Sequence, residues 1–169
     1  MLYEPAEDSF LLQKQVRKYA KGKVLDLGAG TGIQALAALK NTKDVLAADI
    51  NPKAVKHCKK LGINVIKSNL FSNIKSKFDL IIFNPPYLPD DNLNLEDDRN
   101  YIGGEQGNEI LERFFSQAKK HLNKNGKILI VFSSLTSDIN KIIKKHKFKF
   151  KKLSEQKFFF EKLFVYLIY

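Results

Sequence analysis

The sequence predicts an α/β fold, in which a mainly parallel β-sheet is covered by helices on both faces. Short apolar or β-branched runs alternate along the chain with longer amphipathic stretches, and this alternation is typical of parallel sheets with crossover helices. The C-terminal part differs, because two strand-like runs follow each other with only a short connection. We therefore expect an antiparallel strand pair there. With 169 residues and 44% hydrophobic content, the chain is predicted to form one domain, residues 1–169.

The first half of the chain is predicted to form four strands and two helices. An apolar run marks each strand, and Pro52 marks the first turn of the second helix, a position that proline favours. The expected strands are 24–27, 45–49, 64–67 and 78–83, and the expected helices are 33–39 and 52–61. The short strand 64–67 is expected at the edge of the sheet, where another chain could add a strand. Short, lysine-bearing edges also prevent such pairing.

The second half is predicted to form two helices and three strands. The expected helices are 108–122 and 137–146, and the expected strands are 127–132, 148–153 and 162–169, with Gly126 at the approach to the first of these strands. Phe148, Phe150 and the run Phe158, Phe159 and Phe160 are interpreted as strand residues that face a core. The long loop 88–107 is expected to be either functional or mobile.

Charge, cysteine content and hydropathy narrow the possible classes of protein. The net charge is +11, and its excess lies in residues 141–152, either a solvated face or a surface that steers toward an acidic protein or an RNA-containing particle. One cysteine excludes an internal disulfide, and no metal-ligand spacing is present, so no metal site is expected. The neighbours His57 and Cys58 point apart on a helix, which favours a non-catalytic interpretation. No apolar run reaches the ~20 residues of a membrane helix and no signal peptide opens the chain, so we expect a cytoplasmic protein without membrane contact.

A cofactor site is predicted after the first strand, in the segment Asp26-Leu27-Gly28-Ala29-Gly30-Thr31-Gly32. Glycines at this place let the backbone turn sharply and approach a ligand closely, although they could also serve only a tight turn. The spacing D-x-G-x-G-x-G differs from the dinucleotide fingerprint G-x-G-x-x-G, in which helix amides face a pyrophosphate. S-adenosylmethionine has no phosphate but carries a sulfonium and an ammonium group. A carboxylate such as Asp26 therefore favours this cofactor over NAD.

Further candidate contacts follow the second and third strands. Asp49 ends the second strand and is placed to accept hydrogen bonds from both ribose hydroxyls, which would suit NAD equally. Asn69 and Leu70 follow the third strand and are candidates for the adenine edge. Each also has a plainer interpretation, because an Asp at a strand end can cap a helix and a short polar residue there can serve a turn.

The reactive site is predicted at Asn84-Pro85-Pro86-Tyr87, directly after the apolar strand 78–83. The two prolines stop the strand and remove two backbone donors, which leaves the Asn84 amide oxygen and the Pro85 carbonyl as acceptors for both hydrogens of one NH2 group. Tyr87 offers an aromatic face to a planar group. Accepting both N–H bonds stabilises the positive charge that develops on a delocalised nitrogen as it is methylated, without a general base. The alternative is a Pro-Pro turn that merely ends the strand.

These segments resemble a known family. The opening Tyr3-Glu4-Pro5-Ala6-Glu7-Asp8-Ser9-Phe10-Leu11-Leu12 is similar to the signature of archaeal and eukaryotic HemK-type glutamine methyltransferases, and the resemblance continues through Asp49-Ile50-Asn51-Pro52, Asn84-Pro85-Pro86-Tyr87 and Gly103-Gly104-Glu105-Gln106-Gly107-Asn108-Glu109. It implies a Rossmann-like class I methyltransferase fold with a seven-stranded sheet. It also implies methylation of the glutamine side-chain amide in the Gly-Gly-Gln motif of class I translation release factors. A small zinc-binding activator subunit that pairs with the sheet edge is the implied partner.

By position, the resemblance assigns roles to individual residues. The expected cofactor-binding residues lie in the opening signature and after the strands: Pro5, Ser9, Asp26, Gly28, Gly30, Asp49, Asn69, Leu70 and Asn84. The expected catalytic residues are Asn84, Pro85 and Tyr87, and the expected substrate contacts are Asn84, Pro85, Pro86, Tyr87 and Leu88. Related chains often carry Asp where this chain has Asn69, which offers no charge to the adenine.

Two other hypotheses stay open. The Asn-Pro-Pro-Tyr motif is shared with enzymes that methylate nucleic-acid bases, so the acceptor could be adenine in DNA or an exocyclic amine in tRNA. Such enzymes must take the base out of its stack. The chain could also be a subunit that is inactive until an activator covers its apolar edge.

Overall fold

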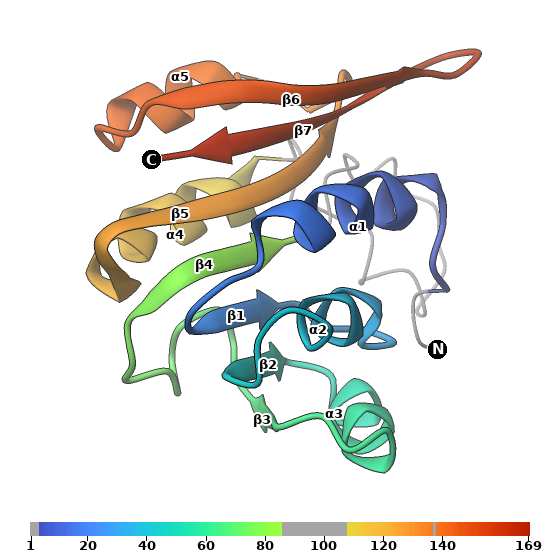
Figure 1. The fold of residues 1–169 in the computed structure, drawn as a ribbon. Helices are drawn as coiled ribbons and strands as arrows, with labels where there is room; N and C mark the ends of the chain where they lie inside the picture. Colours follow the sequence, from blue (N-terminus) through green and yellow to red (C-terminus); the bar gives the residue numbers. More distant parts are fainter. Residues whose placement is uncertain (1–3, 86–107, 137) are drawn as a thin grey trace.

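The computed structural model describes residues 4–85, 108–136 and 138–169, so the predicted loop 88–107 lies outside the described residues. Seven strands form one sheet in the order β3-β2-β1-β4-β5-β7-β6 (Figure 1). The strands are β1 (Val24–Leu27), β2 (Val45–Asp49), β3 (Val65–Lys67), β4 (Phe78–Phe83), β5 (Leu122–Ser133), β6 (Phe150–Lys157) and β7 (Lys162–Ile168). Neighbours from β3 to β5 are parallel, whereas β7 is antiparallel to both β5 and β6. The predicted mainly parallel sheet with an antiparallel C-terminal pair is confirmed.

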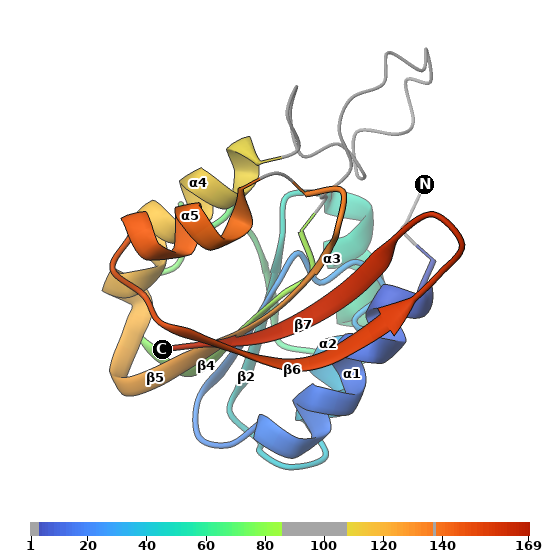
Figure 2. The same cartoon turned by 90° about the horizontal axis from the view of Figure 1, so that it is seen from above.

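Helices cover both faces of the sheet, as Figure 2 shows from above. The helices are α1 (Glu7–Tyr19), α2 (Ile33–Ala38), α3 (Pro52–Lys60), α4 (Glu109–Ala118) and α5 (Ile139–Lys145), and a short 3-10 turn (Lys119–His121) follows α4. Apolar side chains of α1, α2 and α3 share one core layer, and those of α4 and α5 share the other. The sheet is therefore buried on both sides.

Burial on both sides explains why the central strands are nearly continuous apolar runs. Successive strand residues point to opposite faces. In β4, Ile81 joins the layer with α4 and α5, while Ile82 joins the layer with α1, α2 and α3. Both are fully buried, which stabilises the fold by roughly 1.5–3 kcal/mol for each side chain. Polar residues are thus confined to the ends of these strands, where a site can form.

Some expected element boundaries differ from the observed ones. Helix α1 has no counterpart in the predicted elements, because three of its six buried residues are polar: Asp8, Ser9 and Gln15. The expected helix 108–122 ends at Ala118, and β5 begins before Gly126 instead of after it. A Cβ at Gly126 would stand 2.8 Å from the backbone oxygen of Phe78. Glycine is thus required inside β5 for its close approach to β4.

The C-terminal hairpin corrects the interpretation of its phenylalanines. Phe148 is buried and Phe150 packs against the core, as expected. The expectation that the run from Phe158 to Phe160 faces a core is wrong, because Phe159 is 95% exposed and Phe160 is 89% exposed. These residues form the connection between β6 and β7 rather than a strand face.

The two edges of the sheet are the short β3 and the long β6. The edge position predicted for the third strand is confirmed. In the parts of the chain that the structure describes, no helix combines the length and apolar character needed to cross a membrane.

Candidate cofactor and acceptor site

Three strand ends meet at the carboxyl edge of the sheet. The last residue of β1 is in register with residues at the ends of both β2 and β4, so Gly28, Asp49 and Asn84 lie side by side. A Cβ on Gly28 would lie only 3.8 Å from the backbone oxygen of Asn84. Open α/β sheets bind ligands at this edge, next to the strand where the chain order reverses. The predicted cofactor turn and the predicted acceptor motif therefore share one site.

The turn after β1 contains glycines of two kinds. Gly30 and Gly32 have φ angles of 52° and 80°, a region that residues with a side chain rarely adopt. At Gly32 a Cβ would come within 2.6 Å of Ile63 Cδ1, so this glycine allows close packing. At Gly30 a Cβ would meet nothing within 4 Å. The backbone at Gly30 therefore borders open space. A ligand can approach the turn closely only where such space exists.

Asp49 holds this turn in place from the end of β2. Its Oδ2 accepts a hydrogen bond from the Gly30 N–H and its Oδ1 accepts one from the Asn51 N–H, both at 2.8 Å. Burial raises the pKa of the Asp49 carboxyl, against the lowering effect of these backbone donors. Because a carboxylate has about four acceptor positions, both oxygens keep capacity for ribose hydroxyls. The ribose contact itself stays a prediction.

Asp26 is buried beneath the turn, with 1% of its surface exposed. Its Oδ2 accepts a hydrogen bond from the Ala35 N–H at 2.9 Å, which caps α2 from a neighbouring strand, since Gly32 at the helix start has no side chain to do so. Burial raises the pKa of Asp26 to about 7, against that hydrogen bond and with a smaller contribution from Asp49. The carboxylate thus supports the turn. An interaction between Asp26 and the cationic groups of the cofactor stays a prediction.

Cys58 packs against the same turn. The side chain is fully buried, and its Sγ donates to the carbonyl oxygen of Gly30 at 3.6 Å. Burial, with Asp26 and Asp49 nearby, raises the pKa of the thiol to about 11. Nucleophilic cysteines need a lowered pKa, so the geometry supports the non-catalytic interpretation.

At the expected adenine end, the structure adds partners that sequence reasoning missed. The Oδ1 of Asn69 accepts a hydrogen bond from Arg113 Nη2 at 3.0 Å, and Leu70 is buried with a φ of 48°. Ile50, next to Asp49, is 56% exposed although it is a large apolar residue. The sequence did contain a signal for this residue, because Ile50 directly follows Asp49 at the end of a strand. An apolar residue at that position could have been predicted to contact an aromatic ring of the cofactor.

The buried start of α1 holds the Asn84 side chain. Asn84 Nδ2 donates to Asp8 Oδ2 at 3.1 Å and lies 3.5 Å from Ser9 Oγ. Asp8 Oδ1 in turn accepts from the backbone N–H and the hydroxyl of Ser9, and Gln34 Nε2 donates to the Ser9 carbonyl at 2.9 Å. Because its NH2 group is directed to Asp8, the amide oxygen of Asn84 faces away from α1. Asp8 is thus a site residue to which the sequence analysis assigned no role.

The other predicted residues fall into two groups. Pro5 is partly buried just before α1, and Pro85 is buried directly after Asn84. Pro86, Tyr87 and Leu88 lie outside the described residues, so their roles stay predictions. Within residues 4–85, 108–136 and 138–169, no group of three or more His, Cys, Asp or Glu side chains could hold a metal ion.

The donor and acceptor groups present here fit S-adenosylmethionine, which would supply an activated methyl group on its sulfonium sulfur. The open side of Gly30 permits close approach of a ligand to the backbone. Asp49 offers acceptors for a pair of hydroxyls, and Ile50 offers an exposed apolar surface for an aromatic ring. Asn84 stands next to this region with its amide already oriented.

Comparisons with known proteins relate this chain to methyltransferases. Residues 7–160 match the methyltransferase small domain family. A relative in Methanocaldococcus jannaschii, named as a protein N5-glutamine methyltransferase, is 42% identical over 83% of this chain and 78% of its own length. Methyltransferase HEMK2 of Mus musculus is 30% identical over 77% of this chain and 71% of its own length. The fold also matches Mtq2 in the E. cuniculi Mtq2–Trm112 complex, with a TM-score of 0.81 and 24% identity over 99% of this chain and 97% of that chain.

Fold and site together define a class I methyltransferase that uses S-adenosylmethionine. The family match over residues 7–160 and the 42% identity to a protein named as a glutamine methyltransferase also show the family. The chain belongs to the methyltransferase small domain family, and within it to the HemK-type protein-glutamine methyltransferases. The enzyme class and the cofactor expected from the sequence are confirmed.

Proposed function

We propose that this enzyme methylates the side-chain amide nitrogen of the glutamine in the Gly-Gly-Gln motif of a class I translation release factor. The observation that carries the proposal is the Asn84 amide, whose NH2 group is bound by Asp8 and whose oxygen faces away from it. Two relatives that are named as glutamine methyltransferases support it, one of them as a release factor glutamine methyltransferase. So does the Mtq2–Trm112 complex, which is described as responsible for methylating the termination factor eRF1.

In the proposed reaction, the chain holds the target amide and leaves its nitrogen free to face the methyl donor. The Asn84 amide oxygen and the Pro85 carbonyl accept the two N–H bonds of the glutamine. An amide nitrogen is a weak nucleophile, and these two acceptors stabilise the positive charge that develops on it. Asp8 contributes indirectly, since a preoriented acceptor loses no entropy when the substrate arrives. Water removes the surplus proton after the transfer.

The direct test uses labelled cofactor, purified release factor and a release-factor variant in which the glutamine of the motif is replaced by alanine. We expect labelling of the natural protein and none of the variant. Equal labelling of both would contradict the proposal. Labelling of DNA or RNA in place of the protein would favour the nucleic-acid hypothesis instead. The proposed substrate would place the enzyme's action in the cytoplasm.

We also propose a small zinc-binding activator subunit as a partner, bound along the β3 edge. Asn64 and Ser68, which flank β3, hydrogen-bond to β2, so the alternate residues Val65 and Lys67 turn their backbone groups outward. The Lys67 carbonyl already accepts a hydrogen bond from Asn73 Nδ2 at 2.8 Å, so an added strand would pair with Val65 and with the Lys67 N–H. Large apolar side chains are exposed in α2 and directly after α2 and α3 in this half of the molecule: Leu36, Leu39 and Leu61. An added strand with an apolar cover would satisfy both features. The Mtq2–Trm112 complex is a precedent in a protein of the same fold.

A variant pair tests the position of this partner. Lys67→Pro removes an outward N–H, whereas Lys67→Ala removes the same side chain and keeps the N–H. We expect co-purification with the activator to be lost in the first variant and kept in the second. Calorimetry of the lone chain with S-adenosylmethionine is the companion measurement: micromolar binding, on the order of −8 kcal/mol, would argue against an obligatory activator.

A further inference from the structure

The tip of the β6–β7 hairpin exposes three consecutive phenylalanines, Phe158, Phe159 and Phe160. The rings of Phe159 and Phe160 contact each other edge-on, with 5.2 Å between their centroids. The Phe158 N–H donates to the Glu161 carbonyl at 2.8 Å, so Phe159 and Phe160 are the two corner residues of the turn. Such corners favour Gly, Asn and Asp. The local backbone therefore does not account for two phenylalanines at this corner.

The strand register places this tip at the catalytic edge of the sheet. Strand β5 runs parallel to β4, and its last residue, Ser133, pairs with Leu163 near the start of β7. The hairpin turn therefore projects beyond the same edge at which Asn84 follows β4. Figure 1 shows the tip at the end of the molecule where α1 begins, and the C-terminus at the opposite end.

The distance from Asn84 to the tip follows from the register. The end of β4 pairs with Ile130. From there, three residues along β5 and three more along the hairpin give roughly 20 Å at about 3.3 Å per residue. Two strand spacings of about 4.8 Å add roughly 10 Å sideways. The tip is thus about 20–25 Å from Asn84, too far to touch the target glutamine but within reach of the same macromolecule.

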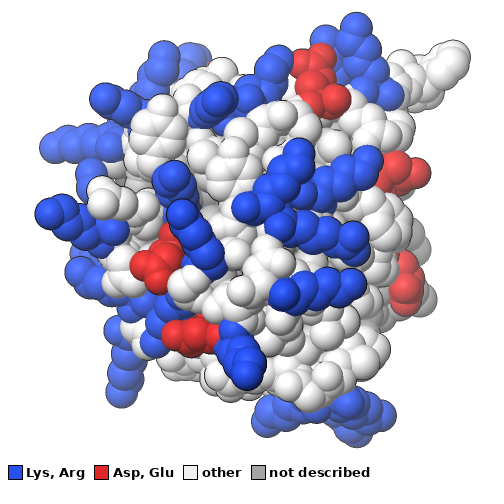
Figure 3. Space-filling model, viewed as in Figure 1, with Lys and Arg blue, Asp and Glu red and all other residues white. Residues whose placement is uncertain are grey.

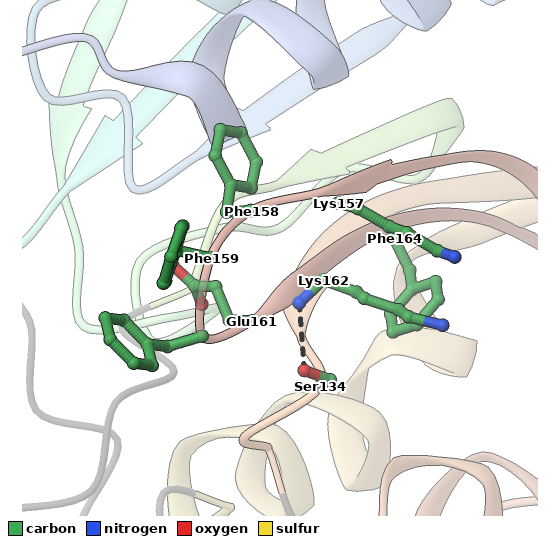
Figure 4. Close-up of a pocket in the computed structure, with 8 residues that line it drawn as sticks. Ser134, Lys157, Phe158, Phe159, Glu161, Lys162 and Phe164 are labelled. Atoms are coloured by element: carbon green, nitrogen blue, oxygen red, sulfur yellow. Dashed lines mark hydrogen bonds between the residues drawn. The ribbon is translucent and has the colours of Figure 1, made fainter.

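The base of the tip is fixed to the turn after β5. Ser133 Oγ donates to Glu161 Oε2, the Ser134 N–H donates to the Lys162 carbonyl at 2.7 Å, and the Lys162 N–H donates to Ser134 Oγ at 3.0 Å. Figure 4 shows Phe158 directed toward a helix while Phe159 projects away from the strands, and Phe160 is 89% exposed. An open hollow of about 490 Å³ lies between the tip and Ser134. Hydrogen bonds to Ser133 and Ser134 therefore fix the base of the tip, and a hollow lies on one side of it.

The charges around the tip indicate the chemistry of its partner. Lys157 and Lys162 face each other across the last strand pair, an arrangement that destabilises an isolated hairpin. The carboxylate of Glu155 is shared between Lys152 and Lys162. Lys and Arg side chains also dominate the face of the molecule shown in Figure 3. A partner surface that is apolar in the middle and acidic around it would complement an aromatic tip that is flanked by lysines.

We propose that the tip formed by Phe158, Phe159 and Phe160 is a docking element for the protein substrate, separate from the site that holds the glutamine. It binds an apolar patch with acidic neighbours on the folded release factor, about 20 Å from the methylated residue. The inference rests on the proposed function, because the molecule that must approach this edge is the substrate. The tip therefore contributes to the choice of protein, while Asn84 determines the chemistry.

The test compares the Phe159→Ser/Phe160→Ser double variant with the wild-type chain on two substrates. One is the folded release factor. The other is a peptide of about nine residues centred on the glutamine of Gly-Gly-Gln, which reaches only about 13 Å on either side of that glutamine. We expect KM for the release factor to rise about 30-fold, as for an aromatic hot spot, with KM for the peptide and cofactor binding unchanged. Tyr169→Ser is the matched control, since Tyr169 is 51% exposed and follows β7 at the opposite end.

The outcomes separate this inference from the proposed function. A double variant that methylates and binds the release factor as the wild type does would overturn the docking role alone. Tip-dependent binding to RNA or to anionic vesicles, with an unchanged KM for the release factor, would overturn it in favour of another kind of surface. A wild-type chain that neither binds nor methylates the release factor would overturn the proposed function and the docking role together.

Discussion

The side-chain nitrogen of Asn84 donates a hydrogen bond to the carboxylate of Asp8 at 3.1 Å, across 76 residues of sequence. Asp8 is only 3% exposed, and its second oxygen is bound by Ser9. An amide can rotate by half a turn at little steric cost, so the buried carboxylate decides which half of Asn84 faces the substrate. Asp8 is therefore a positioning residue for the acceptor site.

Replacing Asp8 with Asn is expected to lower kcat by about 10- to 100-fold, which is less than the roughly 100- to 1,000-fold lost when a preorganised group that touches the reacting atoms is removed. An asparagine has one acceptor oxygen for the two partners, so either Ser9 or Asn84 then faces an NH2 group. The measurement is kcat and KM with the protein substrate, together with the melting temperature. Glu7→Gln is the control, because Glu7 is the exposed acidic neighbour on the same turn. Equal effects of both substitutions on kcat would refute the positioning role.

Replacing Asn84 with Ala is expected to spare cofactor binding and to reduce transfer at least 100-fold. The substitution removes an acceptor for the target amide and leaves the turn that contains Gly30 untouched. Calorimetry with S-adenosylmethionine and a single-turnover assay measure the two effects separately. Loss of cofactor binding would show that Asn84 serves the cofactor and not the acceptor.

Replacing Gly30 with Ala is expected to weaken cofactor binding at least tenfold, because the added methyl group enters the open space beside the turn. Gly62→Ala is a matched control, since Gly62 has a φ of 74° and also nothing within 4 Å of an added Cβ. Both variants should lose about 1 kcal/mol of stability from the left-handed backbone. Only Gly30→Ala should change the Kd for the cofactor. Identical cofactor affinities in the two variants would place the ligand elsewhere.

The buried Asp26 is expected to make stability depend on pH. Its pKa is about 7 in the folded chain, against an ordinary value of 3.8 for an aspartate, so between these pH values the folded state holds a proton that the unfolded state releases. The contribution of Asp26 to the free energy of unfolding therefore falls as pH rises from about 4 to about 7 and is constant above. Asp26→Asn should remove this decline, a difference on the order of 2–4 kcal/mol. Urea unfolding of the wild type and the variant at several pH values measures this difference. The same pH dependence of the free energy of unfolding in both proteins would contradict the role of Asp26.

The sequence predicted the elements whose residue pattern directly reflects their burial. The strands from β1 to β4 were predictable because burial on both faces makes them apolar. Helix α1 was not, because polar Asp8 and Ser9 are buried in it to hold Asn84. Phenylalanine is a residue type common in strands, so Phe159 was predicted to face a core. Only the pairing of β6 with β7 shows that it lies at the corner of a turn.

The adjacency of Gly28 and Asn84 has an evolutionary consequence. Since β1 and β4 are hydrogen-bonded neighbours, the separation of donor site and acceptor site is set by the backbone and not by any side chain. A substitution in a hairpin corner or a surface loop therefore leaves this separation unchanged. Retargeting this enzyme to a new protein should then require grafts at the periphery of the sheet and none at its centre.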